Sequence, residues 1–292
     1  MIAGVYFFAR GIDGHALAAA LRGAAILPLL AAAALSFGNL FWKSVCWRVM
    51  LGRWHRVSVF RLYRYTLTAF ASSLLVPARA GEALRVWLLR QRDGVPVTDS
   101  TGVALAEKLV DGMAMVISVS PTLFLIHGLP PWVGRAIVFL VAGTLVGVVV
   151  ILLARRHAPP GGLLGKLAGA MTAFDSPKTF VLALGACLGA WLSDFSCVLL
   201  CLVAVGIPVP PAVGLLILLG VNVAILVPAM PGNLGALEIG AVAALDLVGV
   251  PREAAMAFAI LYHAVQAIPL LLVGLADLRL ALGMARTEVA EP

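Results

Sequence analysis

Charged residues are scarce in this sequence. Asp, Glu, Lys and Arg make up 12% of its 292 residues, while hydrophobic residues make up 62%. The mean hydropathy is +1.05. One water-soluble core cannot bury that much apolar surface, so the composition excludes an ordinary soluble domain and predicts a multi-pass membrane protein.

Cysteine is rare as well, and its spacing carries no metal or redox pattern. The sequence has no CxxC pair, and no histidine is interleaved with its 4 cysteines, which all lie in apolar runs. We interpret them as small buried hydrophobic residues. These residues are Cys46, Cys187, Cys197 and Cys201.

Sequence patterns for cofactor chemistry are also missing. The chain contains no Walker-type phosphate loop and no HExxH or GxSxG motif, and the glycines at 232, 235 and 240 do not follow a predicted strand. We therefore expect no cofactor, no metal and no enzymatic activity.

Long apolar runs dominate what remains. A helix needs roughly 20 apolar residues to cross a bilayer, and a membrane-spanning chain must satisfy its own backbone hydrogen bonds, which favours helices here. Residues 2–9 are too short to span, lack the features of a signal peptide, and are interpreted as part of a further helix. The sequence thus predicts an all-α polytopic membrane protein with about six spanning helices, five of them from the runs 26–50, 101–126, 132–154, 179–205 and 253–277.

The formal net charge of +7 does not indicate nucleic-acid binding, because the basic residues flank the apolar runs. Lys and Arg cluster in residues 48–64, 90–92, 155–178 and 279–286, whereas the loops HGLPP and GIPVPP contain neither. Since cytoplasmic loops are enriched in Lys and Arg, the basic loops and the C-terminus are predicted to be cytoplasmic.

Two short motifs occur twice in the same order. LVPARAG at 75–81 resembles LVPAMPG at 226–232, and GVP at 94–96 recurs at 249–251. Three apolar runs separate the two copies, so the second copy enters the membrane from the opposite face. This arrangement predicts an inverted-topology repeat within a single membrane domain spanning 1–292, with the first repeat at about 26–127 and the second at about 178–280.

Each copy is predicted to form a re-entrant helical hairpin, the first at 60–92 and the second at 211–250. The segment after Gly81 is too short to cross the bilayer, and proline and glycine permit a sharp reversal at the tip. Residues 212–230 are long enough to span fully, so two full spans remain an alternative for the second copy. The predicted tips contain Pro77, Pro228, Pro231 and Gly232.

A phosphate site is predicted at the hairpin tips. The helix after each tip begins inside the membrane, and its N-terminal amides favour an anion. Arginine adds charge with a geometry suited to phosphate oxygens. Asn233 is the predicted N-cap of the second helix. The residues predicted to hold a lipid phosphate are Arg79, Arg85, Lys108, Gly81 and Asn233.

Other ionisable residues occur at apparent membrane depth, including Lys43 and Asp194. A lone charge at the centre of a spanning helix costs roughly 2.5 to 3.5 kcal/mol, so such residues must pair or face water. The tryptophans, Trp47 among them, are mostly assigned to the membrane interface. The residues predicted to exchange protons or ion pairs are Glu82, Glu107, Asp111, Glu238 and His263; the alternative is that the acidic residues form structural salt bridges.

Taken together, PARAGEALRVWLL (77–89), AEKLVDG (106–112) and PGNLGALEIG (231–240) resemble the lysylphosphatidylglycerol synthase transmembrane, or flippase-like, family. The resemblance extends from about residue 12 to 282. Ala78 and Asn233 stand where that family usually has glycine. The matching positions are Pro77, Arg79, Gly81, Glu82, Arg85, Glu107, Lys108, Asp111, Pro231, Gly232, Gly235 and Glu238.

The resemblance implies movement of a lipid, either an aminoacylated phospholipid or a polyprenyl-phosphate-linked lipid, between leaflets of the bacterial inner membrane. The sequence ends soon after its last apolar run, so we expect no lysyl-lipid synthesis. Two alternatives remain. One is an intramembrane enzyme acting on a lipid phosphate or glycosyl group, and the other is a non-transporting subunit of an envelope assembly.

Overall fold

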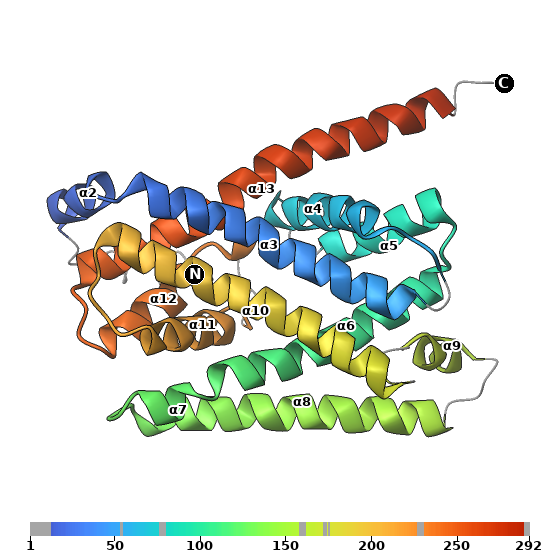
Figure 1. Ribbon diagram of the computed structural model, residues 1–292, viewed down its shortest axis with the longest axis horizontal. Coiled ribbons are helices and arrows are strands. Elements are labelled where there is room, and N and C mark those ends of the chain that lie inside the picture. The colour runs from blue at the N-terminus through green and yellow to red at the C-terminus, as the bar shows by residue number, and fades with distance from the viewer. Residues whose placement is uncertain are drawn as a thin grey trace. The chain divides into compact units, whose positions relative to one another are not determined.

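The computed structural model describes residues 13–52, 55–75, 80–157, 162–171, 174, 176–226 and 231–288, which are helical throughout apart from turns and short connections (Figure 1). No strand occurs in these ranges. The predicted all-α class is therefore confirmed.

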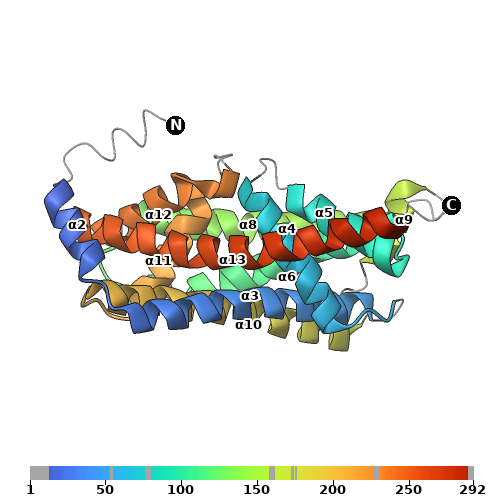
Figure 2. The ribbon, with the colours of Figure 1, turned by 90° about the horizontal axis from the view of Figure 1, so that it is seen from above.

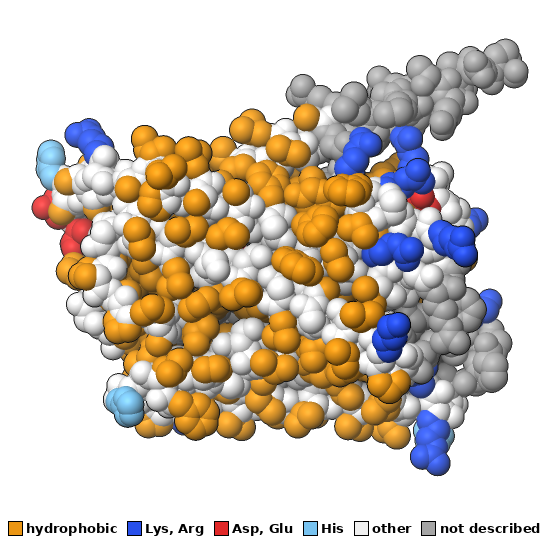
Figure 3. Space-filling view, viewed as in Figure 1, with side chains coloured by type: hydrophobic (Ala, Val, Ile, Leu, Met, Phe, Trp, Pro, Cys, Tyr) orange, Lys and Arg blue, Asp and Glu red, His pale blue; other side chains and the backbone are white. Residues whose placement is uncertain are grey.

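Helices of spanning length account for much of the described chain. Among the described residues, 4 helices are long and apolar enough to cross a membrane. Their predicted bounds agree closely with the structure, and space-filling Figure 3 shows hydrophobic side chains spread over the helices. The protein is a multi-pass membrane protein. These helices are α3 (Ile26–Leu51), α8 (Pro131–His157), α10 (Pro177–Val205) and the part Arg252–Gly274 of α13 (Arg252–Glu288).

The predicted run 101–126 ends earlier than expected. Helix α6 (Val97–Val119) stops before Pro121, and a short helix, α7 (Thr122–Leu125), follows. Proline has no backbone N–H, so it favours a helix start over continuation. Helix α6 has 23 residues, but because of its charged side chains it is not among the 4 helices that are apolar enough to cross a membrane.

The chain divides into two compact units, and α3, α6, α8, α10 and α13 each contribute residues to both. The chain passes from one unit to the other along each of these helices in turn. Unit 1 comprises Met1–Asn39, Gly112–Val146 and Leu188–Gln266; unit 2 comprises Leu40–Asp111, Gly147–Cys187 and Ala267–Pro292.

Unit 2 contains the first hairpin, made of α4 (Val59–Leu75) and α5 (Ala80–Asp93), which lie side by side (Figures 1 and 2). At the base of this hairpin Asp93 accepts hydrogen bonds from Arg61 and Tyr65. The hydrogen bond to Asp93 raises the pKa of Arg61 above its ordinary value. These contacts tie the start of α4 to the end of α5.

Unit 1 contains the second hairpin, α11 (Ala212–Ala224) and α12 (Ala236–Asp246), joined in part by the turn η2 (Pro231–Asn233). Gly220 and Gly240 let the two helices touch, since a Cβ on either glycine would lie 2.5 Å from the other's carbonyl oxygen. Unit 1 also includes α2 (Gly14–Arg22). Helix α11 has 13 residues, and residues 227–230 of the predicted run 212–230 lie outside the description.

The glycines of the two GVP motifs share a backbone conformation after the two hairpins. Gly94 has φ 67° and Gly249 has φ 74°, a left-handed conformation that glycine adopts readily. The hydrogen bonds that follow differ, since the N–H of Val95 donates six residues back to Leu89 O and the N–H of Val250 donates five residues back to Leu245 O, each at 3.2 Å. The sequence echo therefore corresponds to a shared left-handed glycine within turns of different size.

Basic side chains are distributed unevenly between the units. In unit 1 the described Lys and Arg residues are Arg22, Arg135 and Arg252. Unit 2 has many more, and Figure 3 shows Lys and Arg side chains gathered over its elements. The exposed ones in unit 2 are Arg56, Arg61, Arg64, Arg90, Lys108, Arg156, Lys166 and Lys178.

Candidate functional site: an ion-pair cluster in unit 2

The first hairpin brings α5 unusually close to α4 at Gly81. The N–H of Gly81 donates to Ser73 Oγ at 3.1 Å. A Cβ at this position would lie 1.8 Å from the carbonyl oxygen of Ala69. Only glycine fits here, and its presence aligns the following turns of α5 with α3 and α6.

Arg85, on α5, forms a buried ion pair with Glu107 on α6. Arg85 Nη2 donates to Glu107 Oε2 at 2.7 Å, and the two side chains are 3% and 4% exposed. A second guanidinium nitrogen lies 3.5 Å from the hydroxyl oxygen of Thr66 on α4. Removing one partner of such a pair leaves an uncompensated buried charge, so the pair fixes α5 against α6.

Trp47, on α3, completes this buried contact. Its indole Nε1–H donates to Glu107, and the Arg85 guanidinium carbon lies 3.7 Å from the centre of its ring. A cation over an aromatic face is attracted by the ring's quadrupole. Trp47 is 1% exposed, so its assignment to the membrane interface is wrong.

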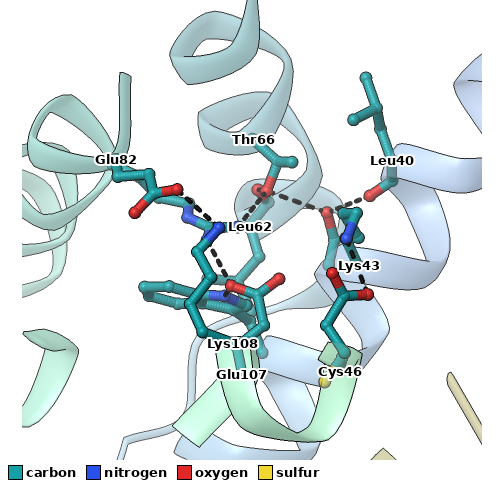
Figure 4. Close-up of polar contacts among 12 residues, drawn as sticks. Leu40, Lys43, Cys46, Leu62, Thr66, Glu82, Glu107 and Lys108 are labelled. Atoms are coloured by element: carbon teal, nitrogen blue, oxygen red, sulfur yellow. Dashed lines mark hydrogen bonds and ion pairs between the residues drawn. The ribbon is translucent and has the colours of Figure 1, made fainter. Parts of the chain in front are cut away.

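A second pair joins α3 to α6 one helical turn further along. Lys43 Nζ donates to Asp111 Oδ1 at 3.1 Å, and both side chains are partly buried. Figure 4 shows Lys43 near Glu107. Glu107 and Asp111 share one helix face, but each has its own cation, which offsets the repulsion between them.

The third pair is the most accessible one. Lys108 Nζ, on α6, lies 2.6 Å from Glu82 Oε1 in the first turn of α5 (Figure 4). The side chains of Lys108 and Glu82 are 46% and 38% exposed. Both groups are therefore open to an incoming ligand, in contrast to Arg85 and Glu107.

These three pairs form what we call the ion-pair cluster: Lys43, Glu82, Arg85, Glu107, Lys108 and Asp111. It contains equal numbers of basic and acidic side chains, so it is neutral when all are ionised. Its members come from α3, α5 and α6, all within unit 2. Such an arrangement can exchange one ion-pair partner for a ligand of the same charge.

Unit 1 holds a separate polar contact at the start of α12. Glu238 Oε2 accepts a hydrogen bond from the N–H of Gly235 at 2.7 Å, and Glu238 Oε1 lies 2.6 Å from His263 Nδ1. The carboxylate thus caps the helix and orients the imidazole. This contact contains no Lys or Arg among the described residues, so it differs chemically from the ion-pair cluster.

The predicted N-cap of α12 is wrong. Gly235, with φ 83°, caps the helix, while Asn233 lies in the preceding turn with φ 58° and an exposed side chain. Gly232, the residue directly before Asn233, is left-handed as well, with φ 68°. This run of left-handed residues delays the helix start by two positions.

Several predicted residues cannot be placed. Pro77, Arg79 and Pro228 lie outside the described residues. Pro231 begins η2, and its side chain is likewise outside the description. The roles predicted for these residues remain predictions.

Two side chains that contact the ion-pair cluster, Trp47 and Thr66, do not follow from the sequence pattern. Trp47 was assigned elsewhere, and Thr66 gave no signal, because a threonine that bonds its own helix backbone is common in apolar helices. For Lys43 the sequence indicates only that a charge at membrane depth needs a partner. The structure identifies that partner as Asp111.

The described residues contain no group of three or more His, Cys, Asp or Glu side chains that could hold a metal ion. All four cysteines are buried and none forms a disulfide. Cys46 and Cys187 lie 3.5 Å apart between sulfur atoms, within unit 2.

Comparison with known proteins gives one family match. The family model described as the lysylphosphatidylglycerol synthase TM region matches residues 1–274. No curated protein matches the chain. The match includes every member of the ion-pair cluster and the Glu238–His263 contact.

Proposed function

The chain belongs to the lysylphosphatidylglycerol synthase transmembrane family, and from this premise we propose that it moves a phosphate-bearing lipid between the leaflets of the bacterial inner membrane. Membership makes it a membrane protein related to lipid handling. The proposal adds the activity, the translocation of an anionic phospholipid or a polyprenyl-phosphate-type lipid.

The half-exposed Lys108–Glu82 pair is the observation that carries the proposal. Inside a bilayer a lysine is retained when it has a partner, and here the partner is as accessible as the lysine. A lipid phosphate can take the place of the Glu82 carboxylate on Lys108, since charge-assisted hydrogen bonds to ammonium suit both anions.

Arg85 supports the site through its buried packing. Its buried pairing with Glu107 and stacking on Trp47 leave it little room to reach a ligand in this conformation. We infer that Arg85 holds α5 in position, while Lys108 makes the first contact with the phosphate.

Connectivity supports an inverted arrangement of the two hairpins. The first hairpin follows α3 in unit 2, and the second follows α10 in unit 1, with α6, α8 and α10 between them. At about 1.5 Å per residue, α4, α5, α11 and α12 are each shorter than the roughly 30 Å hydrocarbon core. We propose that both hairpins are re-entrant and open alternately to opposite faces.

The basic side chains of unit 2 support a cytoplasmic position for its loops, because Lys and Arg are retained on that side. Helix α13 ends with residues of unit 2, so the C-terminus is proposed to be cytoplasmic as well.

Reconstitution into vesicles tests the activity. Phosphatidylglycerol with a fluorescent acyl chain is placed in both leaflets, and a membrane-impermeant quencher reports the fraction that reaches the outside. The protein is expected to accelerate translocation over protein-free vesicles, and the recovered lipid to be chemically unchanged. Conversion of the lipid to a product would instead identify an enzyme.

Variants then test the site. Lys108→Gln is expected to slow translocation by about 10-fold or more, since a hydrogen bond to a charged group contributes about 1.5–3 kcal/mol. This variant also leaves Glu82 without its ion-pair partner. The double variant Lys108→Gln with Glu82→Gln restores the neutrality of the cluster without restoring the cation. The double variant must stay slow; wild-type speed would contradict the proposed role of Lys108. Lys166→Gln, an exposed lysine on α9 (Leu163–Ala170), is the matched control.

A further inference from the structure

The neutrality of the ion-pair cluster has a consequence for any anion that enters it. Lys43 and Arg85 are already compensated by Asp111 and Glu107. A lipid phosphate that displaces Glu82 from Lys108 therefore adds a negative charge to a balanced set. The displaced carboxylate and the phosphate then lie side by side, and two like charges repel each other.

Glu82 is the carboxylate placed to absorb that charge. It is the most exposed acidic member of the cluster, at 38%, and loses its only ion-pair partner among the described residues when the phosphate arrives. A neighbouring negative charge disfavours the ionised form of a carboxylate, so a proton on Glu82 removes its repulsion with the phosphate.

The groups facing Glu82 agree with this assignment. From α6 the facing charge is Lys108, and on α5 the next charged residue, Arg85, is held by Glu107. From α4 the nearest contacts to the start of α5 are the Ser73 hydroxyl and the Ala69 carbonyl at Gly81. Once the phosphate occupies Lys108, these described groups offer no free cation to replace it.

We propose that each lipid phosphate bound at Lys108 is accompanied by one proton bound at Glu82, so that translocation of the anionic lipid is electroneutral and coupled to the pH gradient. This inference rests on the proposed function. The balance is simple: the lysine–carboxylate pair becomes a lysine–phosphate pair plus a neutral carboxylic acid.

The equilibrium distribution of lipid between leaflets tests the coupling and does not depend on how fast a variant works. For an anion moving with one proton, the lipid distribution shifts tenfold per unit of pH gradient and is independent of the membrane potential. For an anion moving alone, the lipid distribution is independent of the pH gradient and shifts about 50-fold per 100 mV of membrane potential. Fluorescent phosphatidylglycerol in vesicles with a potassium diffusion potential or an imposed pH gradient distinguishes the two.

The wild-type protein is expected to follow the pH gradient. Glu82→Gln is expected to follow the potential, because its side chain cannot take up the proton. A wild-type response to potential alone, or a Glu82→Gln protein that still follows the pH gradient, overturns the inference. Asp246→Asn, an exposed carboxylate of unit 1, is the control and should behave as wild type.

A binding measurement keeps the inference testable without transport. Short-chain phosphatidylglycerol added to purified protein in weakly buffered detergent should cause uptake of about one proton per bound lipid, and this uptake should be absent in Glu82→Gln. Binding without proton uptake by the wild-type protein overturns the inference. Failure of the wild-type protein to translocate any lipid would instead contradict the proposed function.

Discussion

At the scale of residues, the buried contact of Arg85, Glu107 and Trp47 decides how the cluster is held. Each partner removes the desolvation penalty of the other, so neither charge is tolerable alone. The more exposed Lys108 and Glu82 lack this constraint and are free to change partners. The cluster therefore combines a fixed part with an exchangeable part.

The buried pair makes a prediction for stability. Arg85→Met leaves Glu107 as an uncompensated buried charge and should lower the free energy of unfolding by about 3–5 kcal/mol. Adding Glu107→Leu removes that charge and should recover most of the loss. Unfolding in mixed detergent micelles measures both. A double variant less stable than Arg85→Met would show that the pair is not a mutually dependent unit.

Sequence reasoning reached the charges of the cluster but not their pairing. Lys43 and Asp111 are 68 positions apart, and Arg85 and Glu107 are 22 apart, so nothing in local spacing links them. Helix periodicity places Glu107 and Asp111 on one face, where two like charges repel each other. The partners come from other helices, and only the packing of α3 and α5 against α6 reveals them.

At the scale of elements, the first hairpin depends on the close approach of α5 to α4. Gly81→Ala would place a Cβ 1.8 Å from the Ala69 carbonyl oxygen. The start of α5 must then move, and with it Glu82. We expect a clear loss of thermal stability together with slower translocation.

Gly185→Ala provides the control for this substitution. Gly185 lies within α10, and a Cβ there meets nothing within 4 Å. Because alanine is favoured over glycine inside helices by roughly 0.5–1 kcal/mol, Gly185→Ala should be neutral or stabilising. Equal tolerance of alanine at both positions would contradict the importance of the close approach.

The elements were largely predictable, while their ends and tips were not. Apolar runs marked α3, α8 and α10 nearly to the residue, because the need to span the bilayer dominates their composition. The break after α6 and the late start of α12 depend on Pro121 and on left-handed residues at Gly232 and Asn233. Composition alone does not specify such local geometry.

At the scale of the whole molecule, the account predicts a topology. The charge distribution predicts that the loops of unit 2 lie in the cytoplasm. Single cysteines at exposed positions test this: Gln91→Cys belongs to unit 2 and His127→Cys to unit 1. The native cysteines are buried, so they should contribute little background labelling.

A membrane-impermeant maleimide applied to intact spheroplasts should label His127→Cys. Gln91→Cys should react only after the membrane is permeabilised. The reverse pattern would place the loops of unit 2 outside and would contradict the proposed orientation.

The central claim is that the phosphate of a lipid takes the place of Glu82 on Lys108. A structure determined with bound phosphatidylglycerol tests it most directly. The account predicts a phosphate oxygen at hydrogen-bond distance, about 2.7–2.9 Å, from Lys108 Nζ, with Glu82 displaced and Arg85 still paired with Glu107. A lipid phosphate bound elsewhere, with Lys108 and Glu82 still in contact, would contradict it.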